Sequence, residues 1–395
     1  MTYKIHQGDN RDILKTLADN SIDAIVTDPP YGIDFLGKSW DANTGALETY
    51  QECLRVLKPG GHILAFSAAR TYHHLAITLE QAGFEIRDQI MWIYSSGFPK
   101  SQDVGRMIQR SLGIKKTKPI QNTTLKSKQL MNEKSGDNIN LYANGEQQVI
   151  CTDTIAQKWE GWGSALKPAH EPICLARKPL KQSIVKNVQE WGTGALNIDA
   201  TRVGEPISYT SKCAFSNNSS LETENETVSD FEEDVTVAGR FPSNVLGEIT
   251  EEYQKYFYCP KVSRQERHIG FEDPGAMFPG SRFDVYMPTA GKTNPETTIE
   301  AVEEKLKDKG NNHPTVKPIE LMKYLIKLIT PPGGVVLDPF NGSGSTGVAA
   351  VEMGFDYIGC ELDPKYVEIS IKRIEAWRNR DYDADVFDSL FTFGD

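Results

Sequence analysis

The chain has 395 residues, of which 39% are hydrophobic and 25% charged, so it has the composition of a water-soluble globular protein and a length that predicts two structural units. No run of about 18 apolar residues occurs, which excludes a membrane span, and the polar start MTYKIHQGDN lacks the apolar region of a signal peptide, so we expect a cytoplasmic protein. The six cysteines form no C-x-x-C pair, which argues against a disulfide framework and a zinc site, and we expect no bound metal.

Strand and helix patterns alternate over the first hundred residues. A β-rich run at 21–28 precedes apolar residues at helical spacing over 46–57, and a buried strand follows at 62–68. A second helix is predicted over 70–82 and a further strand over 84–94. Strands that alternate with helices of this length predict βαβ units and a parallel sheet.

The middle of the chain has another character. Residues 106–160 and 181–310 are rich in Asn, Ser, Thr, Gly and charged residues and show little periodicity. The segment 216–234 has a composition typical of disorder, and 294–312 predicts a short charged helix. One exception, HEPICLARK at 170–178, predicts another strand, which we expect at an edge of the sheet.

The alternation returns near the C-terminus. An amphipathic helix is predicted over 319–329, a strand over 333–338, and a helix at 348–353 after a glycine-rich turn. A strand over 355–362 and a helix over 364–377 complete the series. The sequence therefore predicts one α/β sheet divided along the chain, with loop-rich segments inserted between its two halves.

The motif TDPPYG, 27–32, follows the first of these strands. An aromatic amine is a poor nucleophile because its lone pair is delocalised into the ring, and two hydrogen-bond acceptors around the N–H bonds can draw it toward tetrahedral geometry. Asp28 offers one acceptor, and a backbone carbonyl held rigid by Pro29 and Pro30 offers the other. Tyr31 offers a flat face on which a base extruded from a helix can stack.

A second motif, LDPFNGSGSTG at 337–347, places a glycine-rich turn between a strand and a helix. Such a turn presents backbone N–H groups to a ligand. Glu361 follows Gly342 by nineteen residues and ends the next strand, where a carboxylate in doubly wound folds takes up ribose hydroxyls. The turn is neither G-x-G-x-x-G nor a P-loop, which argues against a nicotinamide or a nucleoside triphosphate and favours another nucleoside cofactor.

These motifs resemble those of the amino-methylating DNA methyltransferases, which form N6-methyladenine or N4-methylcytosine. The first motif is similar to the catalytic motif of that family, and Asp338, Phe340, Gly342 and Gly344 resemble its cofactor loop. The segment from His313 to Pro318 resembles the one that holds the methionine carboxylate, and Gly8-Asp9 resembles an early acidic motif. The order of the motifs, catalytic before cofactor, is that of the β class.

The resemblance implies a Rossmann-like, doubly wound α/β methyltransferase fold, circularly permuted, with an inserted target-recognition region. Residues 1–105 would form the catalytic half, with a further strand near 170–178, and 311–395 the cofactor half. Residues 106–160 would contact DNA, and 181–310 would recognise the target, with a disordered loop near 216–234.

The resemblance also implies the ligands and their sites. The cofactor would be S-adenosyl-L-methionine, bound by side chains of both halves: Asp9, Thr315, Lys317, Asp338, Phe340, Gly342, Gly344 and Glu361. Among these, Phe340 would face the sulfonium, Glu361 the ribose, and Thr315 and Lys317 the carboxylate. The partner would be double-stranded DNA, within a restriction-modification context, and a homodimer is compatible with the class.

Three alternatives remain open. Aspartate in the first position of the catalytic motif favours adenine N6, whereas cytosine N4 is the alternative product. A non-catalytic DNA-binding protein on the same fold, or a methyltransferase of RNA or of a protein amide, is a further possibility. Methylation of cytosine C5 is disfavoured because it needs a cysteine nucleophile after a proline, and the chain has only Cys259-Pro260, the reverse order.

The net charge of −11 is unusual for a protein that contacts phosphates, but the charges are segregated along the chain. Residues 115–134 carry six lysines and one acid, whereas 221–234 carry seven acids and no base. We therefore expect the lysines of 115–134, with Lys178, Lys181 and Lys186, to line the cleft that faces DNA.

Overall fold

The structure is a computed structural model, and it describes residues 2–33, 44–94, 101–113, 153–166, 168–204, 207–212, 232–237, 239–247, 262, 264–271, 311, 313 and 315–379. The chain divides into two compact units, Met1–Ser95 with His170–Asp395, and Ser96–Ala169. The insertion predicted at 106–160 falls within the second unit. None of the described helices is long and apolar enough to cross a membrane.

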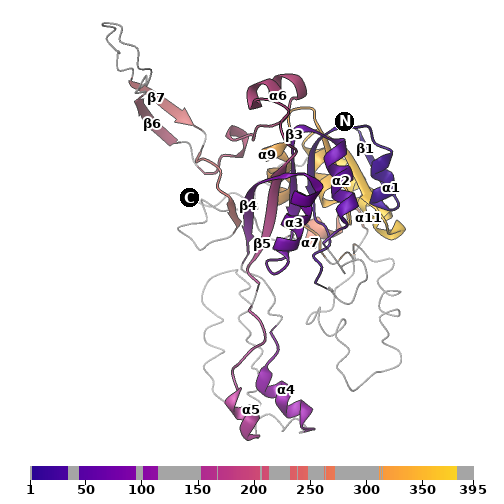
Figure 1. Cartoon of the computed structure of the whole chain (residues 1–395), viewed down its shortest axis with the longest axis vertical. Coiled ribbons are helices and arrows are strands. Elements are labelled where there is room, and N and C mark those ends of the chain that lie inside the picture. Colours follow the sequence, from indigo (N-terminus) through magenta and orange to yellow (C-terminus); the bar gives the residue numbers. More distant parts are fainter. Residues whose placement is uncertain are drawn as a thin grey trace. The chain divides into compact units, whose positions relative to one another are not determined.

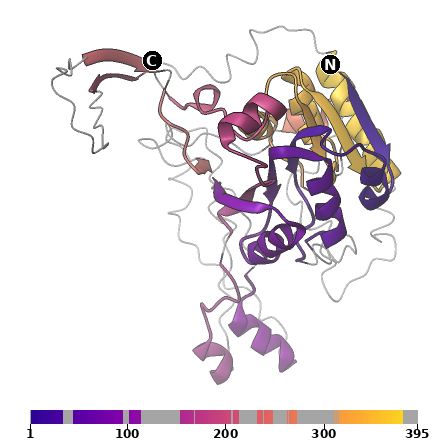
Figure 2. The ribbon, with the colours of Figure 1, turned by 45° about the horizontal axis from the view of Figure 1, so that its top comes forward.

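The first unit is built on an eight-stranded sheet (Figure 1). Its strands, in spatial order, are β1 (Tyr3–Gln7), β10 (Asp356–Glu361), β9 (Val335–Asp338), β2 (Ile22–Thr27), β3 (Leu57–Phe66), β5 (His170–Arg177), β4 (Glu85–Ile93) and β8 (Val245–Gly247). The N-terminal β1 lies beside the C-terminal β10, the indigo and yellow strands of Figure 2. The two halves join where β2 runs parallel to β9, with Ala24 opposite Val336.

One strand departs from the predicted parallel order. β5 runs antiparallel to both β3 and β4, which it separates, so the sheet is mixed. The prediction that 170–178 forms a strand is confirmed, but its predicted place at the edge is wrong. Its residues from Ile173 to Ala176 are buried, as expected for a strand covered on both faces.

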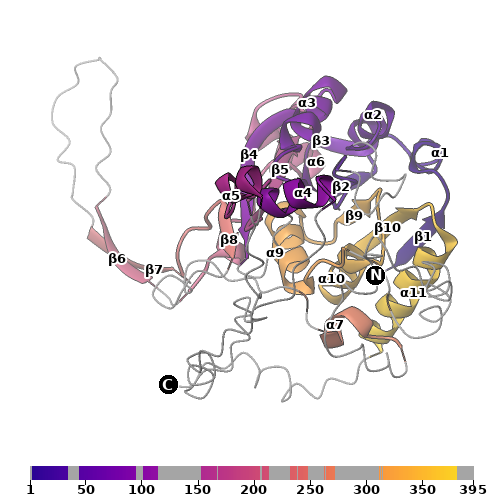
Figure 3. The same cartoon turned by 90° about the horizontal axis from the view of Figure 1, so that it is seen from below.

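Helices cover both faces of the sheet, with α1–α3 on one and α9–α11 on the other (Figure 3). The first face carries α1 (Asn10–Lys15), α2 (Leu47–Val56) and α3 (Tyr72–Ala82), and the second carries α9 (Ile319–Ile329), α10 (Ser345–Glu352) and α11 (Pro364–Arg378). Side chains alternate along each strand, so Ile25 packs under the first layer whereas Ala24 and Val26 pack under the second. This three-layer arrangement is the predicted doubly wound fold, in permuted order.

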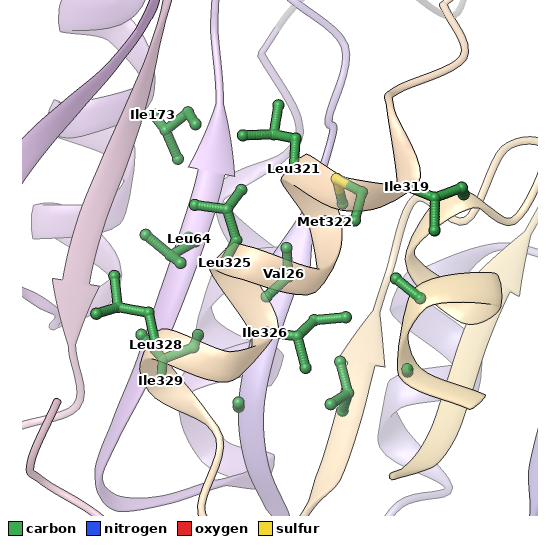
Figure 4. Close-up of a cluster of buried hydrophobic side chains, with 14 of the residues drawn as sticks. Val26, Leu64, Ile173, Ile319, Leu321, Met322, Leu325, Ile326, Leu328 and Ile329 are labelled. Atoms are coloured by element: carbon green, nitrogen blue, oxygen red, sulfur yellow. The ribbon is translucent and has the colours of Figure 1, made fainter. Parts of the chain in front are cut away.

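The packing of α9 is important for the site because Lys317 lies two residues before this helix. Leu321, Leu325 and Leu328 of α9 project toward Leu64 and Ile173 of the sheet (Figure 4). The whole apolar face of α9 is buried. Burying a leucine side chain contributes about 1.5–3 kcal/mol, so several such contacts hold the start of α9 firmly over β2, β3 and β5.

Smaller elements complete the first unit: α6 (Ile184–Trp191), the short 3-10 helix Asp199–Thr201, and α7 (Arg264–His268). An antiparallel pair consists of β6 (Ile207–Lys212) and β7 (Glu232–Val237). Residues 232–234, the end of the segment predicted to be disordered, are thus part of a strand. The preceding residues 216–231 lie outside the described part, as do 294–310 and 312. Within the second unit the structure describes α4 (Val104–Ser111) and α5 (Thr154–Lys158). An isolated antiparallel bridge pairs Asp103, just before α4, with Gly163, five residues after α5.

Candidate active site

The predicted motifs meet at one edge of the main sheet. Asp28 directly follows β2, Asp338 ends β9, and Glu361 ends β10, three neighbouring parallel strands. The carboxyl ends of parallel strands lie at the same edge, where open α/β sheets bind their ligands. We call this the carboxyl edge. The topology therefore brings together two motifs that are about 310 residues apart in the sequence.

Four polar side chains form a cluster beyond β2, the Asp28 cluster: Asp28, Tyr31, Glu171 and Lys317. Lys317 Nζ lies 2.5 Å from Asp28 Oδ2 and 3.5 Å from Glu171 Oε2. The Tyr31 hydroxyl lies 2.8 Å from Asp28 Oδ1 and 2.9 Å from Glu171 Oε2. Lys317 Nζ also donates to the Tyr31 oxygen, at 3.1 Å. One cation is therefore shared between two carboxylates.

Burial strengthens these interactions. The Lys317 side chain is 6% exposed and that of Asp28 is 17% exposed, and charges attract more strongly where water is excluded. Burial raises the pKa of Asp28 although Lys317 opposes this shift. Burial alone would lower the pKa of Lys317, but Asp28 and Glu171 outweigh it and raise that pKa. Lys317 is accordingly a permanent cation, which also lies 4.9 Å from the centre of the Phe66 ring.

Asp338 organises the glycine-rich loop from within. Its Oδ1 accepts hydrogen bonds from Thr27 Oγ1 at 2.6 Å and from the Phe340 backbone N at 3.0 Å, and its Oδ2 accepts one from Thr346 Oγ1 at 2.6 Å. Asp338 is buried, and burial raises its pKa to about 6. Because Asp338 is buried and accepts three hydrogen bonds from the chain itself, it shapes the loop, and the bond to Thr27 ties it to β2.

Two glycines of the loop have backbone conformations that disfavour other residues. Gly342 has φ +51° and Gly344 has φ +78°. A Cβ atom at Gly342 would lie 2.9 Å from His313 Nε2, and one at Gly344 would lie 2.8 Å from Ser370 Cβ. The backbone can thus turn closely over its neighbours into α10. Arg373 supports the loop from behind, since its guanidinium donates to the Ser343 carbonyl at 2.6 Å.

The Glu361 carboxylate lies against this loop and suits hydroxyl donors. Its Oε2 accepts from the Gly342 backbone N at 2.7 Å, and its Oε1 accepts from the Asp363 backbone N at 2.9 Å. Each carboxylate oxygen has a second acceptor site, so two sites remain for a ligand. Burial raises the pKa of Glu361 to about 7. The residues of this half therefore fit a nucleoside ligand.

The other predicted cofactor residues surround this loop in part. Asp9 caps α1 and forms an ion pair with Arg11 at 2.5 Å, and Gly8 N bonds the Glu361 carbonyl at 2.9 Å, which joins β1 to β10 at this edge. Phe340 is half-buried, with its ring centre 6.4 Å from that of Tyr50.

Thr315 and Lys317 have different partners in the structure. The Thr315 backbone N donates to His313 Nδ1 at 3.3 Å, whereas Lys317 is engaged by the Asp28 cluster. His313 packs edge-on against Tyr366, with ring centres 4.6 Å apart, and burial lowers its pKa to about 3. Sequence reasoning gave His313 no role of its own. Its ring fills the space where a Cβ on Gly342 would lie, so it packs against the loop.

The opposite end of the sheet, the amino edge, holds a different set of charges. Asp23 pairs with Lys58 at 2.6 Å and accepts the Val335 backbone N at 2.8 Å. Lys178 Nζ donates to Asn20 Oδ1 at 2.8 Å and to the Leu57 carbonyl at 2.6 Å, which lie at the starts of β2 and β3. Lys178 was predicted to line a DNA-facing cleft; its ammonium caps strand ends away from the motifs, which argues against that role. Residues 115–134 lie outside the described part.

Comparison with known proteins identifies the family. The family model described as DNA methylase, that of the N6/N4 methyltransferases, matches residues 22–372. This chain belongs to that family. The match spans both motifs and the segments between them, as the resemblance of the motifs predicted. The family membership confirms the predicted α/β methyltransferase architecture.

Individual relatives are more distant. The chain is 41% identical over 71 residues to the DNA adenine methyltransferase YhdJ of Escherichia coli, a match that covers 18% of this chain and 24% of that protein. It is 23% identical over 419 residues to the type II methyltransferase M.HindIII of Haemophilus influenzae, covering 95% and 96% of the two chains. Among solved structures, the M1.HpyAVI–SAM complex matches with a TM-score of 0.40 at 18% identity, covering 94% of this chain and all of that one.

Sequence reasoning missed Glu171 as a site residue. The strand prediction at 170–178 contained the signal, since a glutamate precedes the apolar run Pro172–Ala176. Because β5 is antiparallel, its first residues lie at the carboxyl edge, beside the ends of β2 and β3. A strand placed at the sheet edge, as predicted, would not have brought Glu171 to Asp28.

Proposed function

We propose that this chain transfers a methyl group from S-adenosyl-L-methionine to the exocyclic N6 of an adenine in double-stranded DNA. The observation that carries this proposal is that Asp28 follows β2 at the same edge where the glycine-rich loop follows β9 and Glu361 ends β10. A methyl donor bound by the loop and an amine bound by Asp28 would be neighbours at this edge.

Residues near the ends of β2, β9 and β10 have the following roles in this proposal. Asp28 and a carbonyl of the Asp28-Pro29-Pro30 segment accept the two amine hydrogens, and the Tyr31 ring stacks on the extruded base. Asp9 and Phe340 contact the cofactor, whose ribose hydroxyls donate to Glu361. The cofactor supplies an electrophilic methyl group when bound. Lys317 holds the Asp28 carboxylate in place, a role that replaces its predicted contact with the methionine carboxylate.

Adenine is favoured over cytosine N4 by two observations. The catalytic motif begins with aspartate, and the similar stretch of YhdJ belongs to a protein described as a DNA adenine methyltransferase. The role of duplex DNA as the substrate rests on the family. The homodimer and the cytoplasmic location stay predictions.

The product base tests this function directly. The chain is expressed in a bacterial host that lacks DNA methylation of its own, and the host DNA is digested to nucleosides for mass spectrometry. We expect N6-methyladenine, and none in cells that express Asp28→Asn. N4-methylcytosine would establish the alternative product, and DNA without either base would overturn the proposed activity. RNA from the same cells is digested in parallel and should lack methylation that depends on the chain.

A further inference from the structure

Glu171 has no role in the reaction as described above, yet its carboxylate belongs to the Asp28 cluster. It lies at the start of β5, with Oε2 2.9 Å from the Tyr31 oxygen and 3.5 Å from Lys317 Nζ. The hydroxyl of Tyr94, which follows β4, hydrogen-bonds the same carboxylate. The Glu171 side chain is 21% exposed, more than those of Asp28 and Lys317, so solvent reaches it.

The Tyr31 hydroxyl cannot donate a hydrogen bond to both carboxylates at once. The hydroxyl has one hydrogen, but its oxygen is 2.8 Å from Asp28 Oδ1 and 2.9 Å from Glu171 Oε2. An ionised carboxylate is only an acceptor. With both carboxyl groups ionised, one of these two short contacts joins an acceptor to an acceptor. A proton on either carboxyl group turns both contacts into hydrogen bonds, so the cluster has a place for one additional proton.

Methylation of an amine releases one proton, and that proton must leave the site. We propose that Glu171 takes up this proton through the Tyr31 hydroxyl, an inference that rests on the proposed methyl transfer. Glu171 does not touch the substrate and is a positioning residue that acts through Tyr31 and Asp28. By drawing the proton away, it returns Asp28 to its ionised form.

The steps balance without another reactant. The nitrogen forms its bond to the methyl carbon as the carbon–sulfur bond breaks, and the electron pair of that bond stays on sulfur. The N–H bond then breaks toward Asp28 Oδ1, and its electron pair stays on nitrogen. Asp28 passes this proton to the Tyr31 oxygen while the Tyr31 hydroxyl proton moves to Glu171 Oε2. Glu171 releases the proton to water.

The surrounding charges agree with this path. Lys317 cannot take the proton, because Asp28 and Glu171 raise its pKa against the effect of burial and keep it charged. Burial raises the pKa of Asp28, which favours a carboxyl group that holds a proton between the two steps. The groups that face Glu171 are Asp28, Tyr31, Tyr94 and Lys317, from β2, β4 and the segment before α9.

The test compares rates of methyl transfer over many turnovers with DNA and labelled cofactor, since each new turnover needs the Asp28 carboxylate restored. Glu171→Gln keeps the shape of the side chain and one acceptor oxygen but cannot take up the proton. We expect its rate constant to fall roughly 10²-fold, as for the loss of an acid–base group, with cofactor and DNA affinities unchanged. Glu85→Gln is the matched control, since Glu85 lies on β4 and pairs with Arg177 at the other end of β5; we expect the wild-type rate.

Two further readouts separate proton transfer from structural support. Tyr31→Phe should slow transfer similarly, and the double variant Tyr31→Phe/Glu171→Gln should be no slower than either single variant, because both remove the same path. Formate should restore at least a tenth of the rate lost in Glu171→Ala, because it supplies a carboxylate to the vacated space, whereas chloride should not.

A wild-type rate in Glu171→Gln would overturn the proposal, and so would multiplicative losses in the double variant or a Glu171→Ala protein that formate does not rescue. Failure of the proposed function has a different signature, since the wild-type protein itself would then transfer no methyl group to DNA. The two failures are thus distinguished by the wild-type reaction.

Discussion

The two edges of the main sheet both hold aspartates and lysines, but they differ in the number of carboxylates that share each lysine. At the amino edge, Asp23 has its own lysine, Lys58, and a backbone donor, and Lys178 is held by strand-end acceptors. At the carboxyl edge, Asp28 and Glu171 share one lysine, Lys317. Balanced pairs of the first kind hold strands together. A surplus of acceptors leaves lone pairs for a substrate, and perturbed pKa values gather at such sites.

Loss of Lys317 should have the largest effect on stability. Lys317→Met leaves two buried carboxylates facing each other, which costs about 3–5 kcal/mol of unfolding free energy. The loss should grow as the pH rises, because protonation of the Asp28 carboxyl, whose pKa burial raises, relieves the repulsion at low pH. Urea unfolding between pH 5 and pH 8 measures both quantities.

The matched control for that experiment is Lys58→Met at the amino edge. Asp23 keeps the Val335 backbone donor there, and the Lys58 side chain is already 28% exposed. We expect a smaller loss than for Lys317→Met. Equal losses would show that the two edges do not differ in how much they depend on their lysines.

Lys178 should matter for stability and not for DNA. Lys178→Met leaves the Asn20 and Leu57 oxygens at the strand starts without this donor, and because both bonds are only part-buried we expect a loss of about 1 kcal/mol. The slope of log DNA affinity against log salt should stay that of the wild type, since no phosphate contact is lost. A slope reduced by about one unit would show that Lys178 contacts a DNA phosphate.

The smallest expected effect is a pH dependence of cofactor binding at Glu361. Its pKa is about 7, and only the ionised carboxylate accepts two ribose hydroxyls. Affinity should therefore rise with pH, by about tenfold between pH 6 and pH 8. Calorimetry on Glu361→Gln should give a weaker affinity that does not vary over this range. A pH-dependent affinity in this variant would assign the titration to another group.

The sequence predicted the elements with strong periodicity well. The α9 helix has the predicted bounds of 319–329, because its apolar face repeats strictly and proline precedes and follows it. By contrast, β1 and α1 were missed since both are short and rich in polar residues. β3 begins at Leu57, five residues before the predicted strand, because Pro59 and the two glycines after it continue the strand instead of only ending the helix.

The two motifs predicted the carboxyl edge, but not the contacts within it. Spacing along the chain placed Glu361 at the end of a strand, where it does lie. It could not reveal that β5 enters the sheet in the reverse direction, which brings Glu171 to Tyr31. Nor could it reveal that α9 holds Lys317 over Asp28, because that contact depends on packing between segments 289 residues apart.

The most direct test of this account compares single-turnover methyl transfer by Asp28→Asn and by Asp23→Asn under saturating cofactor. Each change removes the charge of one aspartate and keeps its shape, one at each edge of the sheet. The account predicts that Asp28→Asn slows transfer to adenine by about 10²–10³-fold, the cost of losing a charged acceptor in the transition state. Asp23→Asn should keep the wild-type rate and lose only thermal stability. Equal rate losses in the two variants would contradict the assignment of chemistry to the carboxyl edge.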